Sequence, residues 1–337
     1  MAEPAAPTQD AAQRIRAVWR HRGAAAWALW PLSQLYRALL CLHQAPYRLG
    51  LRHSGRAGVP VVVIGNVIAG GAGKTPVTLA VVRHLQSRGW HPGVISRGYG
   101  RQTQDCREAH PDSPPQEVGD EPALIARTAG VPVFVARQRL EAALALRQAH
   151  PHIDVLVCDD GLQHQALARD IEVCVFNDEG LGNGFLLPAG PLREPWPRPV
   201  NAVLHAAPQP PAGTLAPAYR LERRLSPLAR NAQGQTLALA ALQGRPLHAL
   251  AAVARPEDFF AMLRAQGLTL ERAEALPDHS DFDSWKPPQD KNMELICTEK
   301  DAIKLWRTHP QAWAVPLELN ISPGFFAQLD ASLSSAP

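Results

Sequence analysis

The sequence predicts an α/β protein with a doubly wound, mostly parallel sheet, followed by a second, smaller α/β domain. Three observations lead to this prediction. A β-branched run at 59–64 leads through a glycine-rich loop into an apolar-periodic segment at 75–88. Strand-like and helix-like segments then alternate up to residue 206, as they do in parallel sheets. A Pro/Ala-rich stretch at 208–217 separates this part from a shorter series of strands and helices.

The individual elements follow from apolar periodicity and from turn-forming residues. In the first part we expect strands at 59–64, 91–96, 131–135, 153–158, 171–176 and 202–206, and helices at 75–88, 121–128 and 137–149. The polar, proline-rich stretch 102–119 is expected to form a mobile surface loop. In the second part we expect a hairpin from 219–225 and 236–242, strands at 247–253, 269–274, 294–297 and 313–319, and helices at 256–266 and 300–306.

These elements divide the chain into three parts. Residues 1–55 are expected to form an N-terminal amphipathic, membrane-associating segment that belongs to the first domain. Residues 56–217 are expected to form the main α/β domain, and residues 218–337 a smaller α/β domain joined to it by a hinge.

The N-terminal segment is basic and rich in tryptophan. Residues 11–56 contain no acidic residue and eight arginines: Arg14, Arg16, Arg20, Arg22, Arg37, Arg48, Arg52 and Arg56. We expect one or two amphipathic helices over 15–42, with a break or kink at Pro31. Trp and Tyr beside Arg are typical of an interfacial helix, and the longest apolar run here is about half of the roughly 20 residues that span a bilayer. The alternative is a helix packed on the domain; the absence of acids favours the anionic membrane surface.

Composition excludes several classes of protein. With 46% hydrophobic and 19% charged residues the chain is globular, not disordered. Five cysteines without a CxxC pair predict a reduced chain without a disulfide framework or a zinc site. The first ten residues lack the pattern of a signal peptide. A net charge of +3 gives no sign of a nucleic-acid partner, and we expect a monomer with no obligatory protein partner.

The strongest chemical motif is Gly70-Gly71-Ala72-Gly73-Lys74-Thr75, between an expected strand and an expected helix. In that context it predicts a P-loop, and so a P-loop NTPase-like fold: glycine amides and the helix N-terminus bind phosphate oxygens. Lys74 would neutralise phosphate charge and the Thr75 hydroxyl would hold Mg²⁺. The general P-loop motif has glycine where this chain has Ile68. The GGxGKT core resembles the P-loops of partition ATPases and metallochaperone GTPases, but Ala69 stands where many of those proteins have a lysine that is typical of dimeric ATPases.

Acidic residues follow at three further places. Asp159 and Asp160 end the strand expected at 153–158, the position of a carboxylate that holds Mg²⁺ beside a P-loop. Asp120 and Glu121 open a helix, where they could be catalytic or could only favour the helix N-terminus. Asp278 and His279 lie in a polar loop; an Asp–His pair can orient a base, although a simple loop hydrogen bond is the alternative.

Eight strings, in order along the chain, resemble those of the tetraacyldisaccharide 4'-kinase family of lipid A biosynthesis. They are IGNVIAGGAGKTP (64–76), SRGYGR (96–101), VGDEP (118–122), DDGLQH (159–164), RD (169–170), GNGFLLPAGPLREP (182–195), PDH (277–279) and TEKDAIKL (298–305). They extend over most of the chain, and the basic, Trp-rich N-terminus resembles the family's membrane-associated helix. Ile68 is not a departure within this family.

The resemblance implies a lipid kinase. Its substrate would be a tetraacyldisaccharide 1-phosphate that receives the γ-phosphoryl group of ATP on its 4'-hydroxyl, with Mg²⁺ as cofactor. Such a lipid stays in the bilayer, so the enzyme would work as a peripheral or monotopic protein at the cytoplasmic face of the inner membrane.

The resemblance also implies roles for individual residues. Asp120 would be the catalytic acid, acting with His279, which Asp278 would orient. Thr75, Glu121, Asp159 and Asp160 would lie around the metal, and residues 70–75 would bind the nucleotide. The residues expected to line the reaction centre or to bind the substrate's phosphate are Tyr99, Gln163, His164 and Arg193.

Two other functions share some of these features. A P-loop GTPase or metallochaperone would carry an N-K-x-D motif after a strand, or a Cys/His cluster; the segment 298–301 (TEKD) has the position but not the order. A nucleotide-switched membrane adaptor would share the P-loop and the amphipathic helix. It would have no need of the Asp278-His279 pair or of 182–195, and it would hydrolyse ATP without phosphorylating a lipid.

Overall fold

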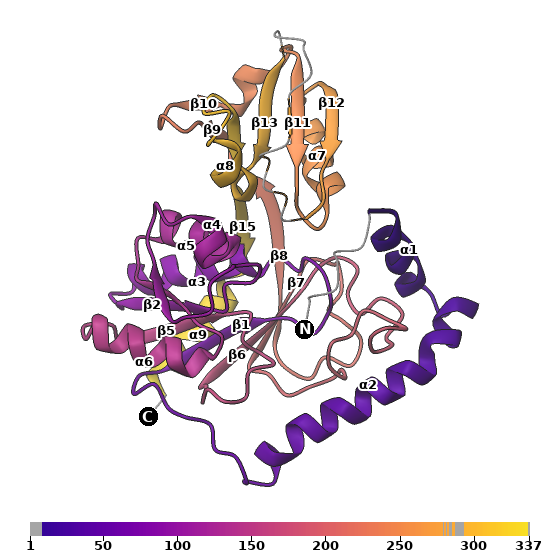
Figure 1. Ribbon diagram of the computed structural model, residues 1–337, viewed down its shortest axis with the longest axis vertical. Helices are drawn as coiled ribbons and strands as arrows, with labels where there is room; N and C mark the ends of the chain where they lie inside the picture. Colours follow the sequence, from indigo (N-terminus) through magenta and orange to yellow (C-terminus); the bar gives the residue numbers. More distant parts are fainter. Residues whose placement is uncertain (1–8, 279, 281, 283–284, 287–292, 336–337) are drawn as a thin grey trace.

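The computed structural model describes residues 9–278, 280, 282, 285–286 and 293–335 and contains two sheets, one above the other in Figure 1. The larger sheet has the order β15-β8-β7-β6-β1-β5-β2-β4-β3. From β8 to β4 all neighbours are parallel, and the edge strands β3 and β15 are antiparallel to their partners. The predicted α/β class with a mostly parallel sheet is therefore confirmed.

The elements of the larger unit have the following bounds. Its strands are β1 (Val61–Gly65), β2 (Pro92–Ser96), β3 (Arg107–Ala109), β4 (Val133–Val135), β5 (Val155–Asp159), β6 (Ile171–Phe176), β7 (Ala202–His205), β8 (Ala218–Leu225) and β15 (Leu317–Ile321). Its helices are α3 (Lys74–Ser87), α4 (Pro115–Val118), α5 (Asp120–Ala129), α6 (Arg139–Ala149) and α9 (Pro323–Ser334).

Helices cover both faces of this sheet, as a doubly wound fold requires. One core contains apolar side chains of α3, α5 and α9, and the other contains those of α6. Every residue of β1 and β5 is buried, which explains their uninterrupted apolar sequences. Both cores include side chains of these two central strands, so the loops that follow β1 and β5 begin from strands that are buried on both faces.

The smaller sheet has the order β10-β9-β14-β13-β11-β12. Its strands are β9 (Leu228–Arg230), β10 (Thr236–Ala238), β11 (Leu247–Ala251), β12 (Leu270–Ala275), β13 (Glu294–Thr298) and β14 (Trp313–Val315), and its helices are the 3₁₀-helix Leu239–Leu242, α7 (Pro256–Ala265) and α8 (Glu299–Leu305). A separate apolar core fills it, with Phe259 and Phe260 of α7 among its largest side chains.

Four local expectations are wrong. The hairpin expected from 219–225 and 236–242 does not form, because β8 pairs with β7 and β15 of the larger sheet while β10 pairs with β9. The strand expected at 313–319 is divided into β14 and β15, which belong to different sheets. The stretch 102–119 contains β3 and α4. Pro31 does not break the helix that contains it, and α9 was not anticipated.

Two connections join the sheets: β8 leads into β9, and β14 leads into β15. The strands β8 and β15 pair over five residues, Leu221–Leu225 with Leu317–Ile321. They rise from the lower sheet to the upper one in Figure 1. Residues after 217 thus contribute to both sheets, and the proposed boundaries of the domains remain predictions.

Two N-terminal helices, α1 (Gln9–Arg20) and α2 (Ala24–Arg48), lie on the outside of the larger unit, at the lower right of Figure 1. They rest on the glycine-rich segment 182–193. The Ser33 hydroxyl donates to the Leu186 carbonyl (2.8 Å) and accepts from the Ala189 amide (3.1 Å), and the Asn183 amide donates to the Trp19 carbonyl (2.7 Å). In the part of the chain that is described, no helix is long and apolar enough to cross a membrane.

Candidate active site

The P-loop connects β1 to α3, as predicted. Gly70 and Gly73 have φ angles of 101° and 78°, a region that favours glycine, so the loop can turn tightly before Lys74 begins the helix. Ile68 is buried in the core and forms a bridge to Leu192, and the Ala69 amide donates to the Pro191 carbonyl (2.7 Å). The two positions that depart from other P-loops therefore hold this loop against segment 182–193.

A cavity of about 540 Å³ opens at the P-loop, between the two sheets. Its lining includes most of the residues that the sequence singled out: Gly70, Gly71, Ala72, Gly73, Lys74, Thr75, Tyr99, Glu121, Asp159, Asp160, His164, Arg193 and Asp278. Asp120 and Gln163 lie behind this lining, and His279 is outside the described residues. Apolar side chains of the smaller unit, among them Val253 and Phe259, line the cavity as well, and they could hold a flat ring.

Asp159 ends β5 and lies buried beside the P-loop helix. Its carboxylate accepts a hydrogen bond from the Thr78 hydroxyl (2.9 Å). Burial, followed by the negative charge of Glu121, raises the pKa of Asp159 to about 6; Asp160 also raises it, while Lys74 and the Thr78 hydrogen bond lower it. This excess of negative charge beside the P-loop is the environment that a divalent cation would relieve.

Asp160 turns away from the strand with a φ of 50°, a conformation that Asp tolerates better than most residues. Its carboxylate lies 3.8 Å from Lys74 Nζ and 3.3 Å from Arg193 Nη1. Burial would raise the pKa of Asp160, but Lys74 and Arg193 outweigh that effect and lower the pKa below its usual value. Asp160 therefore stays ionised and holds both cations at the cavity.

These donors fit Mg²⁺ rather than a metal with an all-protein cage. Among the residues that the structure describes, no group of three or more His, Cys, Asp and Glu side chains could hold a metal ion. Mg²⁺ needs fewer protein ligands, because it keeps water and binds phosphate oxygens together with one or two carboxylates. The hydroxyl of Thr75 and the carboxylate of Asp159 are hard oxygen donors of the right kind.

The raised pKa of Asp159 predicts a pH-dependent metal affinity. A metal binds the carboxylate and not the acid, so the Mg²⁺ concentration needed for nucleotide binding should rise by up to about tenfold per pH unit below pH 6. We expect Asp159→Asn to remove this contribution. The affinity for Mg²⁺ would be measured by titration in the presence of ATP, between pH 5 and 7.5, for wild type and for Asp159→Asn. The difference between the two proteins separates protonation of Asp159 from protonation of the nucleotide. Equal pH slopes would contradict the assignment.

Arg193 is held in place from several sides. Its guanidinium donates to Gln163 Oε1 (2.6 Å) and to Asn66 Oδ1 (3.0 Å), and Gln163 Nε2 donates to the Asn66 carbonyl (3.0 Å). Its carbonyl accepts a hydrogen bond from the Tyr36 hydroxyl of α2 (3.0 Å). Gln163 therefore positions Arg193 and is not among the residues that line the cavity, and Tyr36 connects α2 to the backbone of Arg193.

The N-terminus of α5 meets α8 of the smaller unit. Lys304 of α8 lies 2.9 Å from the buried carboxylate of Asp120 and donates to the Ser280 carbonyl (3.2 Å). Lys300, one turn earlier, lies 3.2 Å from Glu121 and 3.7 Å from Asp278. The two lysines thus bring the acids of α5 and the loop around Asp278 to one place.

A family profile matches most of the chain, and this match identifies the family. The sequence profile of the family described as tetraacyldisaccharide-1-P 4'-kinase matches residues 25–334. The chain belongs to this family. A tetraacyldisaccharide 4'-kinase of Acidovorax sp. (strain JS42) is 67% identical over 335 residues, which are 99% of this chain and 98% of the relative. One of Delftia acidovorans (strain DSM 14801 / SPH-1) is 64% identical over 326 residues, 96% of each.

A solved structure has the same fold. The crystal structure of the "apo" form of LpxK from Aquifex aeolicus in complex with ATP superposes with a TM-score of 0.78 at 24% sequence identity, covering 91% of this chain and 99% of that chain. This superposition supports the P-loop kinase architecture. The lipid-kinase class follows from membership of the family, which sets aside the GTPase, metallochaperone and adaptor alternatives.

The family's segment TEKDAIKL, whose role the sequence left open, begins α8. Thr298 caps the helix by accepting from the Asp301 amide (3.2 Å). The Asp301 carboxylate accepts from the Thr298 hydroxyl (2.6 Å) and from the Ala252 amide (3.0 Å). The segment therefore fixes a helix whose lysines face Asp120 and Glu121. The i, i+4 spacing of Lys300 and Lys304 could have indicated that both lie on one side of a helix. It could not indicate that they would contact Glu121 and Asp120.

Two further family positions, Tyr99 and His164, lie at the cavity, and Tyr99 is 63% exposed. The loop that carries Tyr99 packs on the turn before Asp120: Gly119 has a φ of 94°, and a Cβ there would lie 2.9 Å from the Gly98 backbone. Burial, followed by the charges of Arg139 and Arg97, lowers the pKa of His164 to about 4. A neutral imidazole is thus available for hydrogen bonding at neutral pH.

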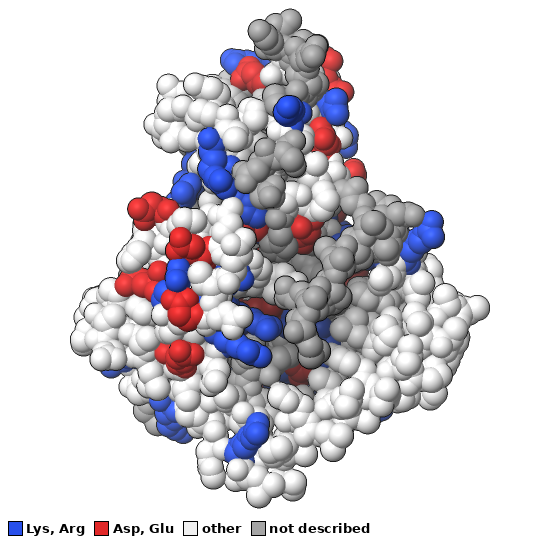
Figure 2. All heavy atoms as spheres, in the orientation of Figure 1, with Lys and Arg blue, Asp and Glu red and all other residues white. Residues whose placement is uncertain are grey.

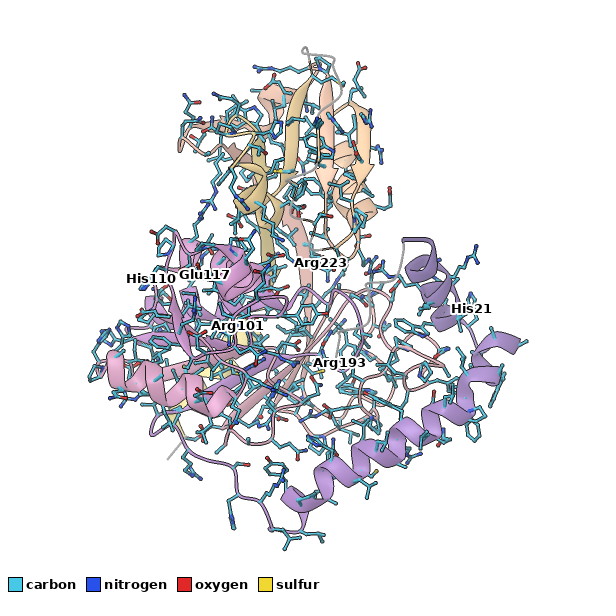
Figure 3. All side chains as sticks on the ribbon, in the orientation of Figure 1. His21, Arg101, His110, Glu117, Arg193 and Arg223 are labelled. Atoms are coloured by element: carbon cyan, nitrogen blue, oxygen red, sulfur yellow. The ribbon has the colours of Figure 1, made fainter. Side chains whose placement is uncertain are left out.

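Of the arginines at the cavity, only Arg193 was assigned a role from the sequence motifs. Arg97, Arg139, Arg223 and Arg255 line the cavity in addition to Arg193. Arg139 is almost completely buried and donates to the Asp160 carbonyl (3.1 Å), while its Nε and Nη1 have no partner among the described atoms. Figure 3 places Arg223 where the two units meet and Arg193 below it, within the larger unit. The cavity is suited to a ligand with several phosphate groups.

Proposed function

We propose that the protein transfers the γ-phosphoryl group of Mg-ATP to the 4'-hydroxyl of a tetraacyldisaccharide 1-phosphate. One observation supports this most directly. The P-loop, the acids at Asp159 and Asp160, and the contact between α5 and α8 all meet at one cavity. Phosphoryl transfer depends mainly on positioning and on neutralising charge, and these groups supply both.

On the nucleotide side, the amides of residues 70–75 and the N-terminus of α3 would bind the phosphates. Lys74, whose Nζ lies 3.8 Å from the Asp160 carboxylate, would bind the β- and γ-phosphates. Thr75 and Asp159 would hold Mg²⁺, with Glu121 and Asp160 beside it. When bound, the metal would neutralise charge on the transferring group.

On the acceptor side, Asp120 would accept the proton of the 4'-hydroxyl, with His279 as its partner. Lys304 holds the Asp120 carboxylate and the Ser280 carbonyl together, and Lys300 holds Glu121 near Asp278. We assign both lysines as positioning residues that bring Asp278 and Ser280 to α5. Because they come from the smaller unit, the base would be complete only when the two units are together.

The anionic lipid head group would meet the arginines at the cavity. Arg193 would bind phosphate, and Gln163 would keep it aimed into the cavity through the 2.6 Å hydrogen bond. Tyr99 and His164 would contact the sugar, Tyr99 by its exposed ring and His164 as a neutral hydrogen-bonding group.

The substrate's acyl chains require access to a membrane, and α2 offers a suitable surface. Its inner side carries the buried Ala26 and Ser33, whereas its opposite side exposes Leu32, Leu35, Leu39 and Leu42. Trp27 and Trp30 are also exposed, and Trp27 lies edge-on against the ring of Phe185. The region of α2 in Figure 2 is largely white, that is, without charged side chains. A row of exposed leucines, with exposed tryptophans on the same helix, is suited to shallow insertion between lipid head groups. We place the protein at the cytoplasmic face of the inner membrane.

The basic residues of this segment are less free than the sequence indicated. Arg22 donates to the Asn183 carbonyl (2.8 Å) and lies over the Phe185 ring, and Arg20 lies 3.8 Å from Glu179. Replacing these arginines would therefore disturb the attachment of α1 as well as the charge. The leucines of the outer side provide the cleaner test.

We expect the triple variant Leu35→Ser, Leu39→Ser and Leu42→Ser to bind vesicles of anionic phospholipid at least about tenfold more weakly, because it removes the apolar surface that would enter the membrane. Co-sedimentation with the vesicles measures this. Leu144→Ser on α6 is the matched control, since Leu144 is similarly exposed but lies on another helix. Unchanged sedimentation of the triple variant would contradict the proposed anchor.

The reaction itself is tested by whether ATP consumption depends on the lipid. With wild-type protein in detergent, we expect ADP release to require tetraacyldisaccharide 1-phosphate and to be absent with the same lipid blocked at its 4'-hydroxyl. ATP hydrolysis at the same rate without the acceptor would contradict the proposal and would favour a nucleotide switch.

A further inference from the structure

Arg223 lies on β8, one of the two strands that connect the sheets. Side chains alternate along a strand, so neighbouring arginines of the sequence RLERRL face opposite ways. The side chain of Arg224 is 65% exposed and lies 2.9 Å from Glu222 on the surface. Arg223 faces inward and lines the cavity at the P-loop. In Figure 3 it lies between the lower and upper units.

The guanidinium of Arg223 reaches the P-loop itself. Its Nη2 donates to the Ala72 carbonyl over 3.0 Å. A Cβ placed on Gly73 would lie 3.0 Å from the same nitrogen, so the guanidinium is next to the residue that precedes Lys74. One hydrogen bond to a carbonyl occupies one of the five N–H donors of an arginine and leaves the others for a ligand.

The nearby carboxylates of Asp178 and Asp258 form ion pairs with Arg255. Arg255 Nη2 lies 2.9 Å from Asp178, and Arg255 Nε lies 2.8 Å from Asp258. The Ala72 carbonyl is the polar contact that the structure records for the Arg223 side chain among the residues described. Burial, followed by repulsion from Arg255, lowers the pKa of Arg223. A guanidinium placed in this way gains most from an anion that enters the cavity.

We propose that Arg223 binds the triphosphate of the nucleotide from the connecting strand, as a second cation beside Lys74. This inference rests on the proposed use of ATP at the P-loop. It adds a phosphate ligand that lies outside every motif quoted from the sequence. Because β8 continues directly into β9, this contact also ties the occupied P-loop to the strand that carries the smaller unit.

The test compares two neighbouring arginines. Arg223→Met removes the inward charge, and Arg224→Met removes an outward charge from the same strand. Calorimetric binding of ATP, ADP and AMP with Mg²⁺ requires no lipid, so a negative result here is separate from a failure of the kinase assay. We expect Arg223→Met to weaken ATP binding by about 10- to 100-fold and AMP binding by much less, with Arg224→Met close to wild type.

Two measurements separate phosphate binding from a merely structural contact with Ala72. Arg223→Lys, which keeps the charge, should recover part of the ATP affinity. Hydrogen exchange of P-loop amides without nucleotide should be the same in Arg223→Met and wild type. Equal ATP affinity in Arg223→Met and wild type would overturn the proposal. Faster P-loop exchange in both Arg223 variants, with no recovery by lysine, would overturn it too, because the side chain would then only shape the loop.

Discussion

Replacing Asp120 by asparagine should lower kcat for lipid phosphorylation by about 10²- to 10⁴-fold, the usual contribution of a general base. Asparagine keeps the size of the side chain and an oxygen for Lys304, which lies 2.9 Å from the carboxylate, but it has no charge with which to take the hydroxyl proton. Because Asp120 would act on the acceptor hydroxyl and is not part of the P-loop, we expect the affinity for ATP to stay near that of the wild type. Steady-state kinetics and direct nucleotide binding measure the two effects separately.

The matched control is Asp330→Asn. Asp330 belongs to α9 and lies 2.8 Å from His84 and 3.3 Å from Arg88, so it is an ion-paired carboxylate away from the cavity. We expect its replacement to leave kcat within about twofold of wild type, since surface ion pairs contribute little. A similar loss of kcat in both variants would indicate a general effect of charge and not a base at Asp120.

Replacing Lys74 by methionine should lower kcat/KM by about 10²- to 10³-fold, in this case with weaker ATP binding as well. Lys74 begins α3 directly after Gly73, so its ammonium is fixed where phosphate would bind the loop. In the absence of this lysine, Asp160 would keep Arg193 as its cationic partner and would repel the triphosphate. Equilibrium binding of ATP and initial rates of lipid phosphorylation measure the two components.

Lys286→Met is the control for this second variant. Lys286 is exposed and is not part of the cavity lining, so the same chemical change there should alter neither quantity by more than about twofold. Wild-type ATP affinity in Lys74→Met would show that the cation at the P-loop does not contact the nucleotide.

The parts that local sequence determines were predicted well. β1 could be located because its apolar run is buried on both faces between two cores. The P-loop could be located because its positive φ angles at Gly70 and Gly73 favour glycine, which makes the motif visible. The prediction of Asp159 and Asp160 at one site followed from parallel strands whose carboxyl ends share an edge. The amphipathic N-terminal segment was also visible, although Pro31 did not end its helix.

Strand pairings and side-chain contacts between residues far apart in the sequence could not be predicted. The strand β8 has the alternating pattern of a hairpin strand, and nothing local shows that its partner is β15, some 90 residues later, rather than the next strand. Lys300 and Lys304 were part of a recognised motif, but their function depends on acids from another unit. Arg223 gave no signal at all, because one arginine among three in a charged strand has no periodicity of its own.

The most direct test of the account is transfer of label from [γ-³²P]ATP to tetraacyldisaccharide 1-phosphate. Wild type, Asp120→Asn and Lys74→Met would be incubated with the lipid, Mg²⁺ and detergent, and the lipids separated by thin-layer chromatography. The account predicts a labelled lipid with wild type and almost none with either variant, although Asp120→Asn still binds ATP. Labelling of the lipid by Asp120→Asn at the wild-type rate would contradict it, because the reaction would then proceed without the group that the contact between α5 and α8 positions.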